Sequence, residues 1–315
     1  MSKKSFMLQE TRQIATRVQL ALDSDLPELP SAPEHLYTLA RGSSDHAATV
    51  VQRLMANTAI PATTMPPSLM QHNLRMTDSL VLGISQSGAS PDLCLAAEKC
   101  RQQGCPVIAL LNVLASPLAE VASITLAQHA GAERAVAATK SVVCSIVMGA
   151  RLAEYWGAPA FQLHRLPDQI RSAQQQPIDD LISLFSADGP LLVLGRGTGL
   201  GIAAEIALKV QELLGRPAMA YSSAEVLHGP AGMVVDGYPV LALAVGHERT
   251  SVLSAVKQLG KAGADVLVLD GDCRVDDMAS VVLLTRVYLA LEAACRQRGR
   301  SPDKPDNLNK VTLTL

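Results

Sequence analysis

Two halves of the chain follow the same pattern of apolar runs and turns. In the first half an apolar run ends at Arg41-Gly42, and in the second half the run GPLLVLG ends at Arg196-Gly197, 155 residues later; a helical pattern follows each. The next apolar runs, SLVLGIS and YPVLALAV, begin 159 residues apart, and a third pair, PVIALL and ADVLVLD, begins 158 residues apart. Three matched segments at a nearly constant offset predict a duplicated structural unit.

The alternation within each half predicts the fold class. Short strands that are apolar on both faces alternate with helical patterns of about 10 to 15 residues, which is typical of parallel sheets joined by right-handed crossovers. We therefore expect an α/β protein with two tandem subdomains, each a parallel sheet flanked by helices. Ligands bind such sheets at the carboxyl ends of the strands, so functional residues are expected directly after the strands.

Changes in composition mark the expected boundaries. The expected segments are an N-terminal helix over 1–28, a first unit over 29–156, a linker over 157–177, a second unit over 178–300 and a tail over 301–315. The linker is distinguished by its Pro, Gln and charged residues. The tail ends in the alternating sequence VTLTL, which is too short to be ordered alone, so we expect it to dock and close the active site.

Composition excludes several classes of protein. The 27 Lys and Arg residues against 29 Asp and Glu, with 3% aromatic residues, leave no basic or stacking surface, so nucleic acid is not an expected partner. No apolar signal segment follows the charged N-terminus and no apolar run reaches about 18 residues, so neither secretion nor a membrane is expected. The six cysteines form no CxxC pair and no Cys/His cluster at metal-ligand spacing. We expect reduced thiols in a cytoplasmic protein, without a metal.

The segment that follows the run SLVLGI carries the strongest local signal. It holds three serines and a glutamine, namely Ser85, Gln86, Ser87 and Ser90. A helix is expected to start near Pro91, because proline is favoured in the first helical turn. Hydroxyl, amide and backbone N–H donors at a helix N-terminus form a phosphate site, and without a Walker-type lysine a nucleoside triphosphate is not implied. Ser43 and Ser44 end the neighbouring strand. N-capping is the alternative for any one serine, but two serine-rich strand ends favour an anion site.

The second half carries titratable residues on an expected helix. Lys209 and Glu212 are three residues apart and share a helix face. A salt bridge on a solvated face is one interpretation. The apolar stretch before Lys209 supports another, in which a buried ammonium lies beside a carboxylate that acts as a general base. His228, directly before Gly-Pro, is a capping, core or functional histidine, and periodicity does not choose among these.

Several motifs in the same order resemble one family. The paired repeats, the SQSGAS loop, AATK at 137–140, the LKVQE helix, the AEVLHGP segment and the NLNK tail are similar to the double-SIS phosphosugar isomerases, which include the isomerase half of glucosamine-6-phosphate synthase and its deaminase relatives. The resemblance extends from about residue 10 to the end of the chain. It implies two tandem SIS subdomains, each a three-layer αβα sandwich of the flavodoxin-like type, that bind a hexosamine phosphate or hexose phosphate.

The resemblance also implies a set of binding residues. These are Ser43, Ser44, Ser85, Gln86, Ser87, Ser90, Val136 and Ala138. Ser90 stands where the family usually has Thr, which keeps a hydroxyl, and Arg41 stands where Cys is frequent. Ala138 replaces a frequent Ser, so a contact to the amino sugar at this position would have to come from the backbone or be lost.

Four further residues match catalytic positions of the family. Glu212 is implied to move a proton between C1 and C2 of the open-chain sugar, with Lys209 as its partner. His228 is implied to open the sugar ring and to reach into the neighbouring subunit's site of a homodimer. Lys310 is implied to lie near the sugar carbonyl, where it can form a Schiff base with a ketose. This chemistry requires no cofactor, so none is expected.

The start of the chain bears on the direction of the reaction. Synthases of the family carry a glutaminase domain whose cysteine directly follows the initiator Met, whereas residue 2 here is Ser and the first cysteine is Cys94. We therefore expect conversion of glucosamine 6-phosphate to fructose 6-phosphate and ammonia. Alternatives are deglycation of fructosamine 6-phosphate and deamination of galactosamine 6-phosphate or an N-acetylated hexosamine phosphate. A non-catalytic sugar-phosphate sensor is also open, but the four matched catalytic residues favour an enzyme.

Overall fold

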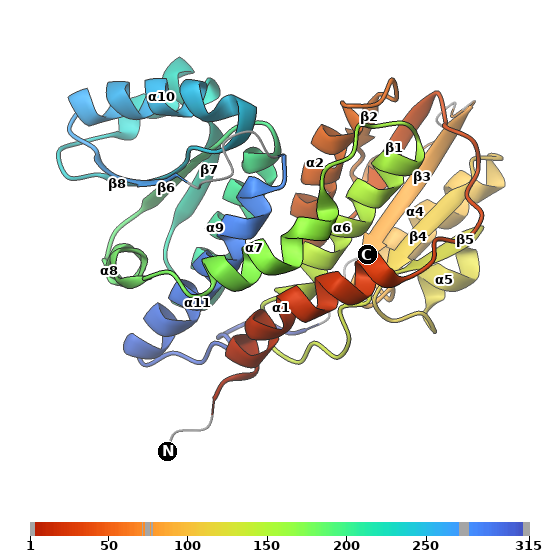
Figure 1. Cartoon of the computed structure of the whole chain (residues 1–315), viewed down its shortest axis with the longest axis horizontal. Helices are drawn as coiled ribbons and strands as arrows, with labels where there is room; N and C mark the ends of the chain where they lie inside the picture. Colours follow the sequence, from red (N-terminus) through yellow and green to blue (C-terminus); the bar gives the residue numbers. More distant parts are fainter. Residues whose placement is uncertain (1–3, 71, 73–75, 77, 271–276, 311–315) are drawn as a thin grey trace. The chain divides into compact units, whose positions relative to one another are not determined.

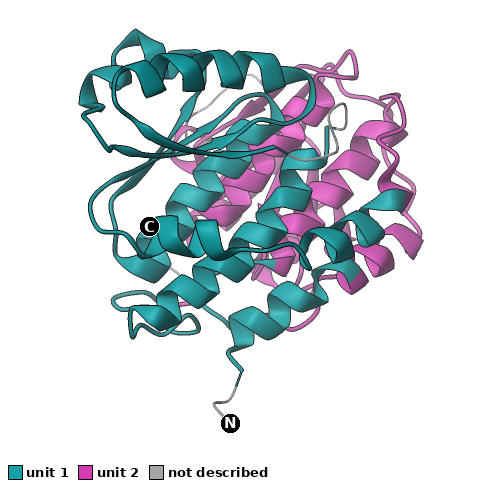
Figure 2. Ribbon diagram, turned by 60° about the vertical axis from the view of Figure 1, so that its left-hand side comes forward, with its two compact units in different colours: residues 1–15, 134–139, 165–308 teal, residues 16–133, 140–164, 309–315 magenta. Residues whose placement is uncertain are grey.

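The computed structural model describes residues 4–70, 72, 76, 78–270 and 277–310, and the chain divides into two units (Figures 1 and 2). Unit 1 comprises residues 1–15, 134–139 and 165–308, and unit 2 comprises residues 16–133, 140–164 and 309–315. Helix α1 (Phe6–Asp23) contributes residues to both. The VTLTL sequence at 311–315, which is expected to dock, lies outside the described residues.

Unit 2 is built on a five-stranded parallel sheet with the strand order β2-β1-β3-β4-β5. Its strands are β1 (His35–Leu39), β2 (Ala62–Thr64), β3 (Ser79–Ser85), β4 (Val107–Leu111) and β5 (Ile124–Ala127). Its helices are α2 (Ser43–Met55), α3 (Pro67–Met70), α4 (Pro91–Gln102), α5 (Pro117–Val121) and α6 (Lys140–Tyr155). This is the flavodoxin-like order, in which the chain reverses direction across the sheet between β1 and β3.

Unit 1 repeats the arrangement with four parallel strands in the order β7-β6-β8-β9. Its strands are β6 (Leu191–Gly195), β7 (Ala218–Ser222), β8 (Pro239–Leu243) and β9 (Asp265–Leu269). Its α-helices are α7 (Leu166–Ala173), α8 (Asp179–Ser186), α9 (Thr198–Leu214), α10 (Arg249–Lys261) and α11 (Ala279–Gln297). The short 3₁₀ helices are η1 (Leu163–Arg165) at the unit boundary, η2 (Glu225–His228), η3 (Pro230–Met233) and η4 (Gly246–Glu248). The predicted fold class is confirmed.

Both faces of the central strands are buried, which explains their continuous apolar sequences. All seven residues of β3 are buried. Because side chains alternate across a strand, Val81 packs in the cluster with Leu93 and Ala97 of α4, while its neighbours Leu80 and Leu82 are buried on the opposite face. In unit 1, apolar side chains of α10 pack in one hydrophobic cluster with alternate residues of β6 and β8.

The duplication extends to backbone conformation and side-chain pairing. Gly42 precedes α2 with φ 53° and ψ −130°, and Gly197 precedes α9 with φ 57° and ψ −130°. In unit 2 Arg41 pairs with Asp92 at 2.7 Å, and in unit 1 Arg196 pairs with Glu248 at 2.8 Å. Glycine adopts this positive φ at little cost, so each strand–helix junction is built in the same way.

Three strands have no counterpart in the sequence-based prediction. They are β2, β5 and β7, each at an edge of its sheet. Their residues are mostly only half-buried or exposed. An edge strand pairs on one side only and needs no continuous apolar run. The strands predicted from apolar runs are all present, and β3 spans Ser79–Ser85 as predicted.

Helices α2 and α6 approach closely at Gly149. A Cβ atom built on Gly149 would collide with the side chain of Val51, which is stiff because it is branched at Cβ. No helix in the described part of the chain is long and apolar enough to cross a membrane.

We predict that Gly149→Ala destabilises the protein by about 1–3 kcal/mol through overpacking. Gly260→Ala in α10 is the matched control, because a Cβ there meets nothing within 4 Å and helix propensity favours Ala over Gly by about 1 kcal/mol. Urea denaturation of both variants measures the difference. Equal stability of the two variants would show that α2 and α6 are not in close contact at this position.

Candidate active site

The loop between β3 and α4 is held in shape by its own serines. Ser85 is buried, and its Oγ accepts a hydrogen bond from the backbone N–H of Gly88 at 3.0 Å. The Oγ of Ser87 accepts one from Ala89 at 3.3 Å. The carbonyl of Gln86 accepts one from Val113 at 3.1 Å. Gly88 has φ +63°, and a Cβ there would collide with Ser116. The loop is therefore a tight turn that only glycine completes.

Neither Ser90 nor either of the two serines after β1 acts as a helix cap through its side chain. Ser90 occupies the N-cap position of α4, but its side chain makes no capping hydrogen bond. The N-cap of α2 is Gly42, and Ser43 and Ser44 lie in the first turn of the helix. The capping interpretation is therefore wrong for all three residues. Hydroxyl groups and helix N-termini are both favourable to an anion at this edge of the sheet.

An ion pair ties these two strand ends together. Arg41, after β1, donates from Nε at 2.9 Å and from Nη2 at 2.7 Å to Oδ2 of Asp92, in the first turn of α4. The Asp92 side chain is only 3% exposed, whereas that of Arg41 is 47% exposed. The last residues of the paired strands, Leu39 and Gly83, are in register. Ser43 and Ser44 are thus held at the same sheet edge as the β3–α4 loop.

A three-charge cluster lies on α9 in unit 1. Lys209 Nζ is 2.6 Å from Oε2 of Glu212 and 3.3 Å from Oε1 of Glu205. The side chains of Lys209 and Glu205 are fully buried, and that of Glu212 is 20% exposed. Tyr288 of α11 donates its hydroxyl to Glu205 at 3.0 Å. Burial opposes the charge of Lys209, but the two carboxylates outweigh it and raise the pKa of the ammonium above its ordinary value.

The cluster decides between the two interpretations of Lys209 and Glu212. The pair is not a solvated surface salt bridge, because Lys209 is inaccessible and is held from both sides. Glu205 and Tyr288 are absent from the sequence-based assignment. The spacing of Glu205 four residues before Lys209, in an otherwise apolar helix, is a signal that could have identified Glu205. Nothing local to the sequence points to Tyr288, which comes from another helix.

The remaining predicted residues lie on short or irregular segments. His228 is exposed and ends η2, directly before Gly229. Val136 and Ala138 are half-buried in the 134–139 segment of unit 1, where the N–H of Val136 donates to the carbonyl of Asp303 at 3.1 Å. Lys310 belongs to unit 2, and its Nζ is 3.3 Å from Oε2 of Glu133. The structure therefore joins Lys209 with Glu212, and Lys310 with a carboxylate that the sequence analysis did not single out.

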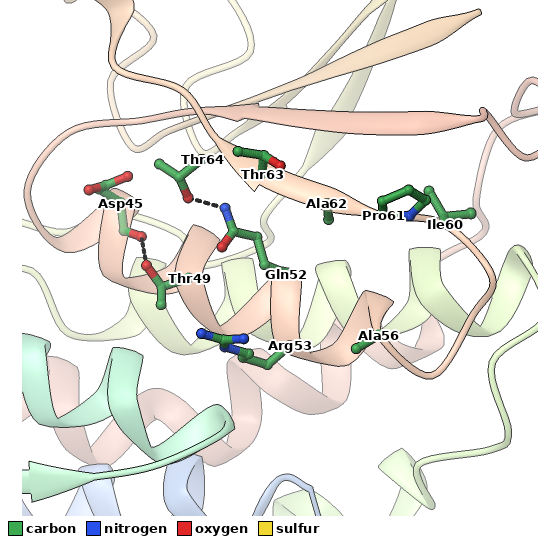
Figure 3. Close-up of a pocket in the computed structure, with 10 residues that line it drawn as sticks. All are labelled: Asp45, Thr49, Gln52, Arg53, Ala56, Ile60, Pro61, Ala62, Thr63 and Thr64. Atoms are coloured by element: carbon green, nitrogen blue, oxygen red, sulfur yellow. Dashed lines mark hydrogen bonds between the residues drawn. The ribbon is translucent and has the colours of Figure 1, made fainter. Parts of the chain in front are cut away.

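A polar cavity of about 540 Å³ lies beside β2, one of the two edge strands of unit 2 (Figure 3). It is lined by Asp45, Thr49, Gln52, Arg53, Ala56, Ile60, Pro61, Ala62, Thr63 and Thr64. Gln52 donates to the hydroxyl of Thr64 across the cavity. Burial raises the pKa of the Asp45 carboxyl, against the opposing effects of His46 and Arg41. Sequence analysis did not anticipate this cavity, because its lining comes from one face of α2 and from a strand that was not predicted.

Comparison with known proteins identifies the family to which the chain belongs. The SIS domain family matches residues 29–155 and 183–283. A protein of Silicibacter pomeroyi DSS-3 that is assigned to the phosphosugar isomerases has a crystal structure similar over 95% of this chain and 100% of its own, with a TM-score of 0.87 and 32% identity. The chain belongs to the SIS domain family, as its motifs predict.

Its curated relatives are longer proteins. Glutamine–fructose-6-phosphate aminotransferase (isomerizing) of Halobacterium salinarum is 32% identical over 94% of this chain and 54% of its own length. The enzyme of the same name from Pyrococcus horikoshii is 26% identical over 97% of this chain and 57% of its own length. The chain therefore spans about half the length of the curated relatives it matches.

We predict that Lys209→Met destabilises the protein by about 3–5 kcal/mol, because it leaves the buried Glu205 carboxylate without its ammonium. Glu212→Gln is expected to lower the free energy of unfolding by less than about 1 kcal/mol, because Lys209 still pairs with Glu205 and Glu212 is partly exposed. Chemical denaturation at pH 7 measures both. Because the pKa of Lys209 is raised above its ordinary 10.5, its contribution is present below that pH and is lost as pH rises through the folded pKa. A Lys209→Met variant as stable as the wild type would contradict the buried cluster.

Proposed function

We propose that this protein is an aldose–ketose isomerase for phosphosugars that converts glucosamine 6-phosphate to fructose 6-phosphate and ammonia. The observation that carries the proposal is the cluster on α9, in which the fully buried ammonium of Lys209 holds the partly exposed carboxylate of Glu212 at 2.6 Å. Isomerisation requires one base that removes a proton beside a carbonyl and returns it to the neighbouring carbon. A single carboxylate, fixed by a buried partner and open on one side, suits that task.

The serine-rich strand ends support a phosphate-bearing substrate. The hydroxyl of Ser90, the first turns of α2 and α4, and the backbone of the β3–α4 loop meet at one sheet edge. Backbone N–H groups and helix dipoles at such an edge favour a dianion. The phosphate would supply binding energy away from the reacting carbons and orient them.

The proposed reaction balances with water as the only co-reactant. Glu212 takes the proton from C2 of the open-chain amino sugar and returns it to C1, while a second proton passes from the C2 amine to the C1 oxygen. The C1 aldehyde and C2 amine thereby become a C1 alcohol and a C2 imine. The amine of Lys310 displaces ammonia from C2 and forms a new C=N bond. Water then releases fructose 6-phosphate and restores the amine. His228 is assigned to ring opening before these steps. Written in the direction of deamination, the reaction needs no donor of ammonia.

We predict that the purified protein releases ammonia and fructose 6-phosphate in equal amounts from glucosamine 6-phosphate. Glu212→Gln should lower kcat by at least about 100-fold, because the proton carrier is lost, while the binding of the sugar phosphate is retained. Coupled assays for both products measure the reaction, and calorimetry measures binding. Activity only on galactosamine 6-phosphate or fructosamine 6-phosphate would correct the substrate. Tight binding without turnover of any hexosamine phosphate would support a sensor instead.

The exposed position of His228 supports a site completed by a second copy of the chain. Met233 and Val235 nearby are also exposed, Val235 at 65%, and exposed apolar side chains on a segment that carries a functional residue favour burial in an interface. We predict that inactive Glu212→Gln and His228→Ala variants regain activity when mixed under exchange conditions. Random pairing would restore about a quarter of wild-type activity, because half of the dimers would each hold one intact site. Subunit exchange without recovery would show that each chain uses its own histidine.

A further inference from the structure

Glu133 is a buried carboxylate with an unusually complete set of donors. Its side chain is 0% exposed. One oxygen, Oε1, accepts the backbone N–H of Ser141 at 3.1 Å, and the other, Oε2, accepts the hydroxyl of Ser141 at 2.7 Å and the ammonium of Lys310 at 3.3 Å. Ser141 lies in the first turn of α6, where the helix dipole favours a negative charge. Two of the three donors thus come from Ser141 of α6 and do not depend on Lys310.

The two members of this ion pair differ in access to solvent. The Lys310 side chain is 26% exposed, whereas that of Glu133 is closed off. Lys140, the first residue of α6, is 1% exposed and donates to the carbonyl of Ala132 at 2.6 Å. Of these two lysines, Lys310 is thus the one that a solute can reach. Its ion-pair partner, Glu133, is closed off from solvent.

We infer that Glu133 is a positioning residue that places the amine of Lys310 for imine formation with a ketose phosphate. The inference rests on the proposed function, in which Lys310 forms that imine. The step converts one ammonium and one ketone into one imine, one water and one proton: the ammonium releases a proton to solvent, the nitrogen bonds to C2, and the ketone oxygen leaves as water. The inference depends on the contact between Lys310 Nζ and Oε2 of Glu133 at 3.3 Å and on the full burial of the Glu133 side chain.

The test is reductive trapping in the full-length protein. With fructose 6-phosphate and cyanoborohydride, the wild type is expected to form a stable adduct at Lys310, detected by peptide mass, and Lys310→Arg is expected to form none. Glu133→Gln should slow trapping by about 10- to 100-fold, because a displaced reacting group loses effective concentration. Glu133→Asp should recover part of the rate, and the Kd for the sugar phosphate should change little in both variants.

Glu10→Gln is the matched control for a purely structural effect. Glu10 is also a buried carboxylate, 4% exposed, and it accepts backbone N–H groups of Arg134 and Ala135 at 2.5 and 3.3 Å. The Glu10→Gln variant should lower the midpoint temperature of unfolding without slowing trapping. Trapping at the wild-type rate in Glu133→Gln, or equal slowing in Glu10→Gln, would overturn the inference.

Two outcomes separate this inference from the proposed function. If the wild type releases ammonia but never forms the adduct, the inference fails while the deaminase stands. If the wild type turns over no hexosamine phosphate but forms an adduct that depends on Glu133, the deaminase fails and the positioning role stands.

Discussion

Parallel pairing of the central strands places the polar segments of this protein where they can act together. Leu39 of β1 pairs with Gly83 of β3, so the residues that follow both strands emerge at one edge of the sheet. Every crossover helix also begins at that edge, with its unpaired N–H groups and the positive end of its dipole. An environment that favours anions therefore follows from strand direction, and the serines and the Arg41–Asp92 pair refine it.

The two copies of the α/β unit share a scaffold but differ in what the scaffold carries. When Gly42 is aligned with Gly197, Glu205 and Lys209 of α9 fall opposite Val50 and Leu54 of α2, which are fully buried apolar residues. Replacing a buried ion pair by packed apolar side chains is often neutral or stabilising, so α9 gains little stability from its charges. Their presence in one copy only therefore brings little benefit to folding, as expected if these charges have the proposed role in the reaction.

The same physical device occurs in both units. In unit 1 the buried Lys209 holds Glu212, which is 20% exposed, and in unit 2 the buried Glu133 holds Lys310, which is 26% exposed. In each case a closed-off residue of opposite charge fixes a group that solvent can reach. Fixing a reacting group in advance lowers the entropic cost of reaction. The proposed mechanism assigns proton transfer to one of these accessible groups and imine formation to the other.

The sequence alone was sufficient for the duplication, the parallel sheets, the bounds of β3 and the serine loop, because these depend on local patterns: apolar runs, turn glycines and residues directly after strands. It was also sufficient to place Lys209 and Glu212 on one helix face. Only the tertiary structure decided that this pair is buried, that Tyr288 and Glu205 complete it, and that Glu133 meets Lys310 across 177 positions of sequence. Burial and long-range pairing depend on which helices pack together, and no local pattern encodes that choice.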